Sequence, residues 1–206
     1  MFSWMNFGSV NSSGPQTINN EQRVSVNHSG PIECNNLVVT GSMVVNGPAQ
    51  LNCSTVNDLT VHGQLSLSES SVNNLSVNGH MNLSKSNVNN PKVHGAATIT
   101  NSSIITGSAL TVYGSVKITD SEIRCASILA SNQIEVQRSS LLGIIVEKGG
   151  SSYGLQEKLV LKNSRVNGDI LFKSGQGLVE SSASVISGRI IGGQLIIVNN
   201  GINLGL

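Results

Sequence analysis

The chain has 206 residues, of which 11% are charged and 3% aromatic, and its formal net charge is +1. So small a charge argues against a nucleic-acid-binding protein, and no Lys/Arg cluster provides a basic patch for an anionic membrane. The 38% of apolar residues include many Val and Ile, which favour pleated sheets, so a folded, β-rich chain is expected rather than a disordered one.

The first 30 residues lack the repeat found further along the chain. Residues 1–10 have neither a basic segment nor a long apolar run, so a secretory signal is not expected. Residues 11–15 read Asn-Ser-Ser-Gly-Pro, which is typical of a flexible linker, and we expect residues 1–30 to form a flexible tail. This tail holds the only Trp and two of the three Phe, and such side chains favour the membrane–water interface. The side chains expected to contact the membrane are Phe2, Trp4, Met5 and Phe7.

From residue 31 onward, a unit of about 16 residues repeats. Val61, Val77 and Val93 occupy equivalent positions, and the pattern returns at Val112 after a three-residue insertion. Apolar and polar residues alternate in runs of two or three, and the alternation changes phase twice within each unit, as three short strands joined by corners would require. The sequence therefore predicts an all-β fold, a triangular parallel β-helix of roughly nine or ten coils with about 16–19 residues each. The four valines should form a core ladder.

Asn-rich pairs recur along the chain and are expected to occupy one corner in successive coils. Asn and Asp tolerate the left-handed conformation that a tight corner needs, and stacked Asn side chains can hydrogen-bond from coil to coil. The pairs are Asn35-Asn36, Asn57-Asp58, Asn73-Asn74 and Asn89-Asn90.

The outward positions give an independent check on the coil. Side chains one repeat apart should lie about 4.8 Å apart on adjacent parallel strands. Three such pairs carry opposite charges, which are mildly favourable across adjacent strands. They are Glu69 with Lys85, Lys117 with Glu135, and Asp120 with Arg138.

The C-terminal part of the chain has an interruption and an uncharged end. The repeat breaks at about residues 143–158, where a Gly-rich run predicts a loop insertion without the Gly-Lys-Ser/Thr of a phosphate loop. The stretch from residue 190 to 206 has almost no charge and no polar cap, although the end of a solenoid must be capped or paired. End-to-end self-association is therefore expected through Ile190, Ile191, Leu195 and Ile197.

No catalytic residue, metal ion or cofactor is expected. The acidic residues are scattered, whereas cleavage of a glycosidic bond needs paired carboxyl groups. His62 and His94 share a column but lie two coils apart, roughly 9–10 Å, which is too far for one metal ion. The cysteines, Cys34, Cys53 and Cys125, form no CxxC pair and are expected to be buried thiols in a reducing compartment.

Three features carry a resemblance to a known family. Residues 61–65 read Val-His-Gly-Gln-Leu, residues 166–170 read Val-Asn-Gly-Asp-Ile and precede the run 183–190, and an aromatic start stands ahead of a linker. In these respects the chain resembles the bactofilins, bacterial polymer-forming cytoskeletal proteins. The resemblance implies a right-handed β-helix that polymerises end to end without nucleotide. It also implies polymer contacts in the terminal coils and membrane contact through Phe2, Trp4 and Phe7.

We therefore predict a non-enzymatic, bactofilin-like structural scaffold that associates with itself in the cytoplasm and attaches to the inner membrane through its N-terminal tail. One alternative is a secreted or surface β-helix that acts as an adhesin or binds a host partner. Another is a β-helix enzyme that acts on polysaccharide. Filaments of the purified protein would favour the scaffold, and a soluble monomer that binds glycans or host protein would favour the adhesin.

Overall fold

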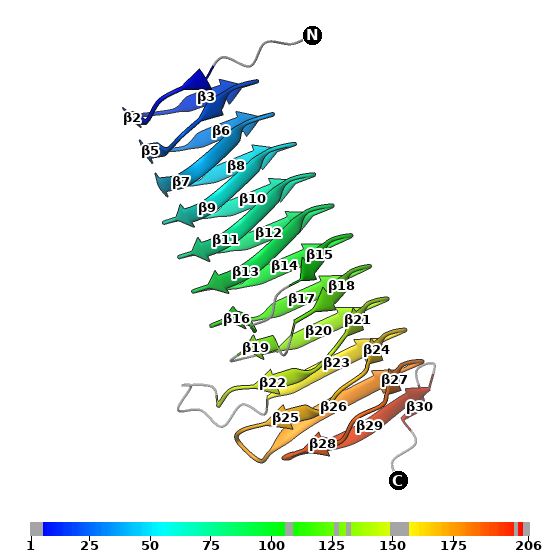
Figure 1. Ribbon diagram of the computed structural model, residues 1–206. Helices are drawn as coiled ribbons and strands as arrows, with labels where there is room; N and C mark the ends of the chain where they lie inside the picture. The colour runs from blue at the N-terminus through cyan, green and yellow to red at the C-terminus, as the bar shows by residue number, and fades with distance from the viewer. Residues whose placement is uncertain are drawn as a thin grey trace.

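The computed structural model describes residues 6–105, 109–125, 128–130, 133–148, 157–199 and 202–203. In these ranges strands are the only regular secondary structure, and they wind into one parallel β-solenoid of about 11 coils (Figure 1). The described part of the chain contains no helix that could span a membrane. The predicted β-helix is confirmed, with slightly more coils than the expected nine or ten.

Side I of the solenoid is formed by one strand from each coil, and these strands pair in parallel as a single sheet. The strands of side I are β3 (Gln16–Asn19), β6 (Ile32–Asn35), β8 (Ala49–Asn52), β10 (Leu65–Ser68), β12 (Met81–Ser84), β14 (Ala97–Thr100), β17 (Val116–Thr119), β20 (Ile134–Gln137), β23 (Lys158–Lys162), β26 (Gly177–Ser182) and β29 (Gly193–Asn199). Strand β30 (Ile202–Asn203) pairs with the end of β29 in the antiparallel direction.

Sides II and III belong to the second sheet, because in four central coils one strand bends over both sides. These bent strands are β7 (Val38–Asn46), β9 (Thr55–Val61), β11 (Ser71–Val77) and β13 (Asn87–Val93). Elsewhere side II is made by β1 (Asn6–Phe7), β4 (Gln22–Arg23), β15 (Ser103–Ile105), β18 (Glu122–Arg124), β21 (Ser140–Leu141), β24 (Arg165–Val166) and β27 (Val185–Ile186). Side III is made by β2 (Val10–Ser13), β5 (Val26–Ser29), β16 (Leu110–Val112), β19 (Ile128–Ala130), β22 (Ile144–Val146), β25 (Ile170–Phe172) and β28 (Ile190–Ile191).

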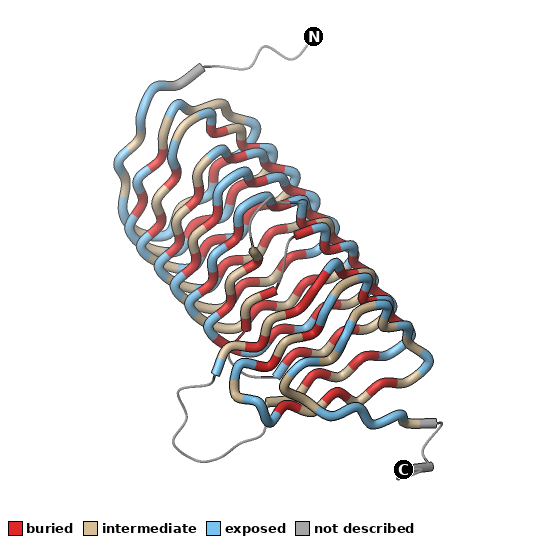
Figure 2. The backbone as a smooth tube through the Cα atoms, turned by 60° about the horizontal axis from the view of Figure 1, so that its bottom comes forward, coloured by how far each residue is buried: buried red, intermediate tan, exposed pale blue. Residues whose placement is uncertain are grey.

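The predicted core ladder is confirmed. Val61 pairs with Val77, Val77 with Val93, and Val93 with Val112, and all four side chains are buried. Alternate residues of each strand point inward, so buried positions line up from coil to coil in Figure 2. The interior is therefore largely apolar along the rod.

The N-terminal tail expected over residues 1–30 is corrected by the structure, because coils begin at β2. Val10 pairs with Val26, and Ile18 pairs with Cys34, each at the 16-residue spacing of the later coils. Ile18 and Val26 are both buried. The outward Asn and Ser side chains and the corner glycine Gly14 give this segment the composition of a linker, although its inward residues keep the repeat.

The loop insertion is narrower than the expected range of 143–158. Val146 in β22 pairs with Ala130 and with Phe172, so residues 144–146 belong to a regular coil. The frame resumes with β23 at Lys158. The interruption is therefore confined to residues 147–157, of which 149–156 lie outside the described residues.

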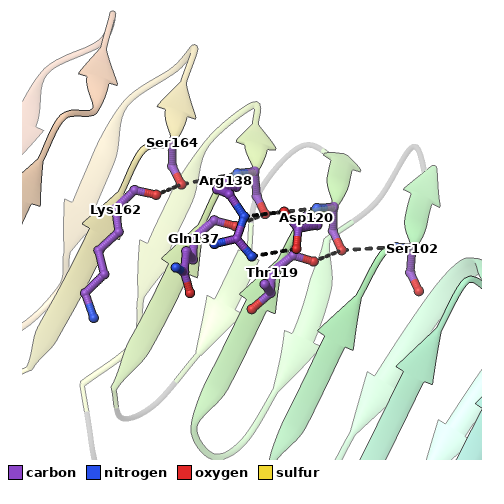
Figure 3. Close-up of polar contacts among 9 residues, drawn as sticks. Ser102, Thr119, Asp120, Gln137, Arg138, Lys162 and Ser164 are labelled. Carbon is purple, nitrogen blue, oxygen red and sulfur yellow. Dashed lines mark hydrogen bonds and ion pairs between the residues drawn. The ribbon is translucent and has the colours of Figure 1, made fainter.

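The corner between sides I and II has one left-handed residue per coil, followed in most coils by a buried Ser. Asp120, with φ of 50°, is one such residue and precedes Ser121. The Ser121 hydroxyl accepts from the Ser102 N–H at 3.1 Å and donates to the Thr119 carbonyl at 2.7 Å (Figure 3). The same bonds recur from coil to coil, so this serine ladder satisfies backbone groups that the turn removes from the sheets.

The Asn pairs do not all share one corner, as had been expected. Asn36, with φ of 54°, is left-handed at the corner between sides I and II. The other three pairs lie between sides II and III, and none of their residues has a positive φ. They do stack: Asn73 donates to Asn57 at 3.2 Å, and Asn90 donates to Asn74 at 2.9 Å. The asparagines therefore act through side-chain ladders at that corner rather than through left-handed backbone.

The serine ladder gives a direct test of this corner. Ser102→Ala should lower the free energy of unfolding by about 1–3 kcal/mol, because the buried Ser86 N–H loses the acceptor that lies 3.1 Å away. Urea unfolding followed by circular dichroism measures the change. Ser103→Ala, on the outward neighbour, is the control and should stay within about 0.5 kcal/mol of the wild type. Equal losses from the two variants would contradict a structural role for the ladder.

Candidate self-association site

The two ends of the rod differ in how well they close the interior. One inward column of side I runs through Cys34 and Leu51 and has Ile18 and Ile197 as its end members. Ile18 is 2% exposed, whereas Ile197 is 51% exposed. This column is thus closed at the N-terminal end and open at the C-terminal end.

The open end presents a group of exposed apolar side chains, which we call the terminal apolar patch. Leu195 and Ile197 belong to inward columns, yet they are exposed, since β29 belongs to the last coil among the described residues. Ile191 and Ile196 add apolar surface on the outside of the same coil. The patch consists of Val185, Ile191, Leu195, Ile196 and Ile197. Isolated apolar residues on a surface are ordinary, but several exposed apolar side chains gathered on one terminal coil indicate an interaction site.

Three of the four residues predicted for self-association are exposed in this patch, namely Ile191, Leu195 and Ile197. The fourth, Ile190, is partly buried and packs against the core. Two members of the patch, Val185 and Ile196, were not predicted from the sequence. Ile196 could have been found, since it belongs to the same uncharged stretch, whereas Val185 lies on β27, ahead of that stretch, and takes an outward position that the sequence did not single out.

Two ion pairs lie beside the patch, and Arg165 pairs in register with Val185. Lys158 Nζ lies 2.7 Å from Glu180 Oε1, and the guanidinium of Arg189 lies 3.0 Å from Asp169 Oδ2. The backbone N–H of Arg189, followed by its guanidinium, lowers the pKa of Asp169. Both of these carboxylates are therefore already engaged with cations.

The N-terminal end contains a polar network inside the first coils. Ser12 Oγ lies 2.6 Å from Gln16 Oε1 and 2.8 Å from Nδ1 of His28, whose Nε2 lies 3.3 Å from the Pro31 carbonyl oxygen. His28 is fully buried and occupies the inward column of Val45. The sequence interpretation placed His28 in a tail and so missed this network.

A shallow groove of about 910 Å³ follows the corner between sides I and II over the C-terminal half of the rod. Serines of the ladder line it, together with the charged side chains of Lys85, Asp120 and Arg138. Both charge pairs predicted at this corner are present: Lys85 Nζ is 3.2 Å from Glu69 Oε1, and Arg138 Nε is 2.5 Å from Asp120 Oδ1 (Figure 3). The groove is thus a polar surface whose main charges neutralise each other.

The third predicted pair, Lys117 with Glu135, is also present at 3.8 Å. Glu135 bonds more closely to Lys162 of the next coil, at 3.1 Å, and this hydrogen bond is the main cause that lowers the pKa of Glu135. The strand register predicted from the sequence therefore holds for the outward side chains as well as for the core.

The Asp120–Arg138 pair gives a prediction about pH. The hydrogen bond from Arg138, together with its positive charge, lowers the pKa of Asp120. The pair should therefore favour the folded state above the pKa of an unfolded Asp, and this contribution should disappear as the pH falls through the folded pKa. Arg138→Gln should return the pKa of Asp120 towards its ordinary value, as measured by NMR titration of the side-chain carboxyl carbon. Arg124→Gln, which removes the partner of Glu122, is the control and should leave Asp120 unchanged; an equal shift in both variants would contradict the assignment.

The histidines expected in one outward column have separate partners. His62 Nδ1 lies 2.8 Å from Asn78 Nδ2, and the His94 ring stacks on Tyr113 with 4.8 Å between centroids. Among the described residues, no group of three or more His, Cys, Asp or Glu side chains is placed to hold a metal ion.

Two of the three cysteines are buried, as expected, and the third is exposed. Cys34 and Cys125 are buried, and burial, with smaller contributions from Glu21 and Glu33, raises the pKa of Cys34 to about 12. Cys53 is exposed, contrary to expectation, because it takes the left-handed corner position with φ of 49°.

The predicted membrane-contact residues Phe2, Trp4 and Met5 lie outside the described residues. Phe7 belongs to β1, whose backbone pairs with β4 at Arg23, while its side chain lies outside the description. No family model, no curated protein and no solved structure matches the chain.

Proposed function

We propose that this protein is a non-enzymatic structural scaffold, similar to the bactofilins, that associates with itself through the C-terminal end of its solenoid. The observation that carries the proposal is the terminal apolar patch, where Leu195 and Ile197 are 47% and 51% exposed although they continue buried columns. Covering a half-exposed Leu or Ile stabilises an interface by about 1 kcal/mol. Several such side chains together favour association of the open ends.

The form of the rod supports a mechanical role. A largely apolar interior runs along the rod, and neighbouring coils are tied by strand pairing, to which serine hydroxyls and stacked asparagines add bonds in many coils. Such a rod resists bending because every strand has its neighbours fixed in register. The outer surface is mostly polar, so the end of the rod is favoured over its sides as the place of association.

Charge placed in the patch tests the proposal. Leu195→Glu combined with Ile197→Glu should convert associated protein into monomer, as measured by size-exclusion chromatography with light scattering and by negative-stain electron microscopy. Val24→Glu combined with Ile105→Glu is the matched control, because these residues are equally exposed, at 50% and 55%, but lie away from the C-terminal end. A wild-type protein that stays monomeric at high concentration and binds glycans or host protein would replace the scaffold with the adhesin.

The second part of the proposal is attachment to the cytoplasmic side of the inner membrane through Phe2, Trp4, Met5 and Phe7. The concentration of aromatic residues at the start of the chain supports it, since one short segment binds weakly but an assembly presents several copies. Deleting residues 1–5 leaves every described coil intact and should reduce co-sedimentation with anionic liposomes. Unchanged co-sedimentation would remove the membrane from the proposal without affecting self-association.

A further inference from the structure

We infer that self-association joins two copies through their C-terminal ends and stops there, giving a finite two-fold pair of rods rather than a growing filament. The inference rests on the proposed function, because it specifies the partner and the stoichiometry of the terminal apolar patch. It comes from the difference in chemistry between the two ends of the same inward columns.

Head-to-tail stacking would continue the columns of one copy into the next. Leu195 would then lie over Gln16, and Ile197 over Ile18, since these residues are the opposite end members of the two inward columns of side I. Gln16 is held by Ser12, and an apolar side chain laid over the amide would remove water from its remaining donors and acceptors without replacing those bonds. Ile18 is only 2% exposed, so it offers Ile197 almost no apolar surface.

The closed N-terminal end is built into the first coils. His28 is 0% exposed and links Ser12 of the coil before it to the carbonyl of Pro31 in its own coil. Ser12 and His28 thus place polar groups in the inward column that Val45 and Val61 occupy in the later coils. At the N-terminal end this column is satisfied by its own hydrogen bonds and gains little from a second copy.

Two C-terminal ends, in contrast, match each other. A two-fold axis across the rods brings the patch of one copy onto the same patch of the other, so Leu195 and Ile197 meet apolar side chains of the same kind. The axis also sets the two β29 strands antiparallel, which permits backbone pairing along Gly193–Ile197, where β26 occupies only one edge. The neighbouring charges, paired as Lys158 with Glu180 and Asp169 with Arg189, lessen repulsion between the two rims.

Sedimentation velocity over a wide range of concentrations tests the stoichiometry. The mass should rise to a plateau at twice the 21.5 kDa of one chain and stay there. Negative-stain images should show rods of at most double length. A mass that keeps growing, or filaments, would overturn the two-fold pair but leave the proposed self-association intact, whereas a monomer at all concentrations would overturn both.

Cross-linking tests which ends meet. In a Cys53→Ser background, Ile197→Cys chains treated with a short bis-maleimide should form covalent dimers, and Gln16→Cys chains should not. Mixing the two variants, one of them carrying a size tag, should give no cross-link between Cys at 16 and Cys at 197. A mixed product would show head-to-tail stacking and overturn the inference, as would a dimeric mass that yields no Ile197→Cys product.

Discussion

Val77→Asp is expected to lower the free energy of unfolding by about 4 kcal/mol or more, because it places a carboxyl group in the apolar column between Val61 and Val93. Val77 is 0% exposed, and its neighbours in the column, Val61 and Val93, carry no cation or hydrogen-bond donor on their side chains. For a chain of this length, such a loss corresponds to a melting temperature lower by about 10 °C or more. Thermal unfolding followed by circular dichroism in the strand region measures it.

Ser76→Asp is the matched control, since it introduces the same side chain one residue away. Ser76 points outward and pairs in register with Lys92 of the next coil, so the new carboxylate meets a cation in water. We expect a change within about 0.5 kcal/mol. If both variants lost the same stability, the inward and outward faces of β11 would have been assigned wrongly, and the solenoid with them.

Gly95→Val should lower the free energy of unfolding by about 3 kcal/mol or more, because the corner between sides III and I brings the backbones of two glycines together. A Cβ on Gly95 would lie 2.1 Å from the carbonyl oxygen of Gly79, which is backbone and cannot rotate away. Overpacking of this kind forces neighbouring coils to move and usually costs 1–3 kcal/mol, with larger losses where the backbone must shift. Equilibrium unfolding in urea gives the difference in free energy.

Gly8→Val provides the comparison for this steric argument. A Cβ on Gly8 would meet nothing within 4 Å, so the same enlargement should be tolerated. Comparable destabilisation by the two substitutions would mean that the loss of glycine flexibility, and not the close approach of the two coils, is responsible.

The register of the fold could be predicted from the sequence because the repeat is nearly constant in length. Once Val61, Val77 and Val93 were aligned, every outward position was fixed as well, and the contact between Asp120 and Arg138 followed although they are 18 residues apart. The prediction was less accurate where composition was used in place of spacing. Residues 10–30 look like a linker only if their outward Asn and Ser are counted together with the inward residues.

The candidate site was predicted less completely, and the reason is physical. The uncharged C-terminal stretch pointed to Ile191, Leu195 and Ile197, but which side chains remain exposed depends on where the last coil ends. The polar network of His28 could not be found, because a buried His is recognised only after its coil has been placed in the solenoid. The left-handed corner residues could not be predicted from composition either. Cys53, Glu69 and Lys85 take this conformation, which composition alone assigns to Asn or Gly.

Because the central coils are equal in length, the length of the rod can change in fixed steps of one coil. Ser71 and Asn87 pair in register on adjacent strands. Excising residues 71–86 would therefore join Ser70 to Asn87, which takes the place of Ser71 in an equivalent strand. The product would be shorter by one strand spacing, about 4.8 Å, and duplicating the same segment would lengthen the rod by that amount. A gene that gains or loses such a segment can therefore adjust the distance between the two ends in discrete steps, without redesigning either end.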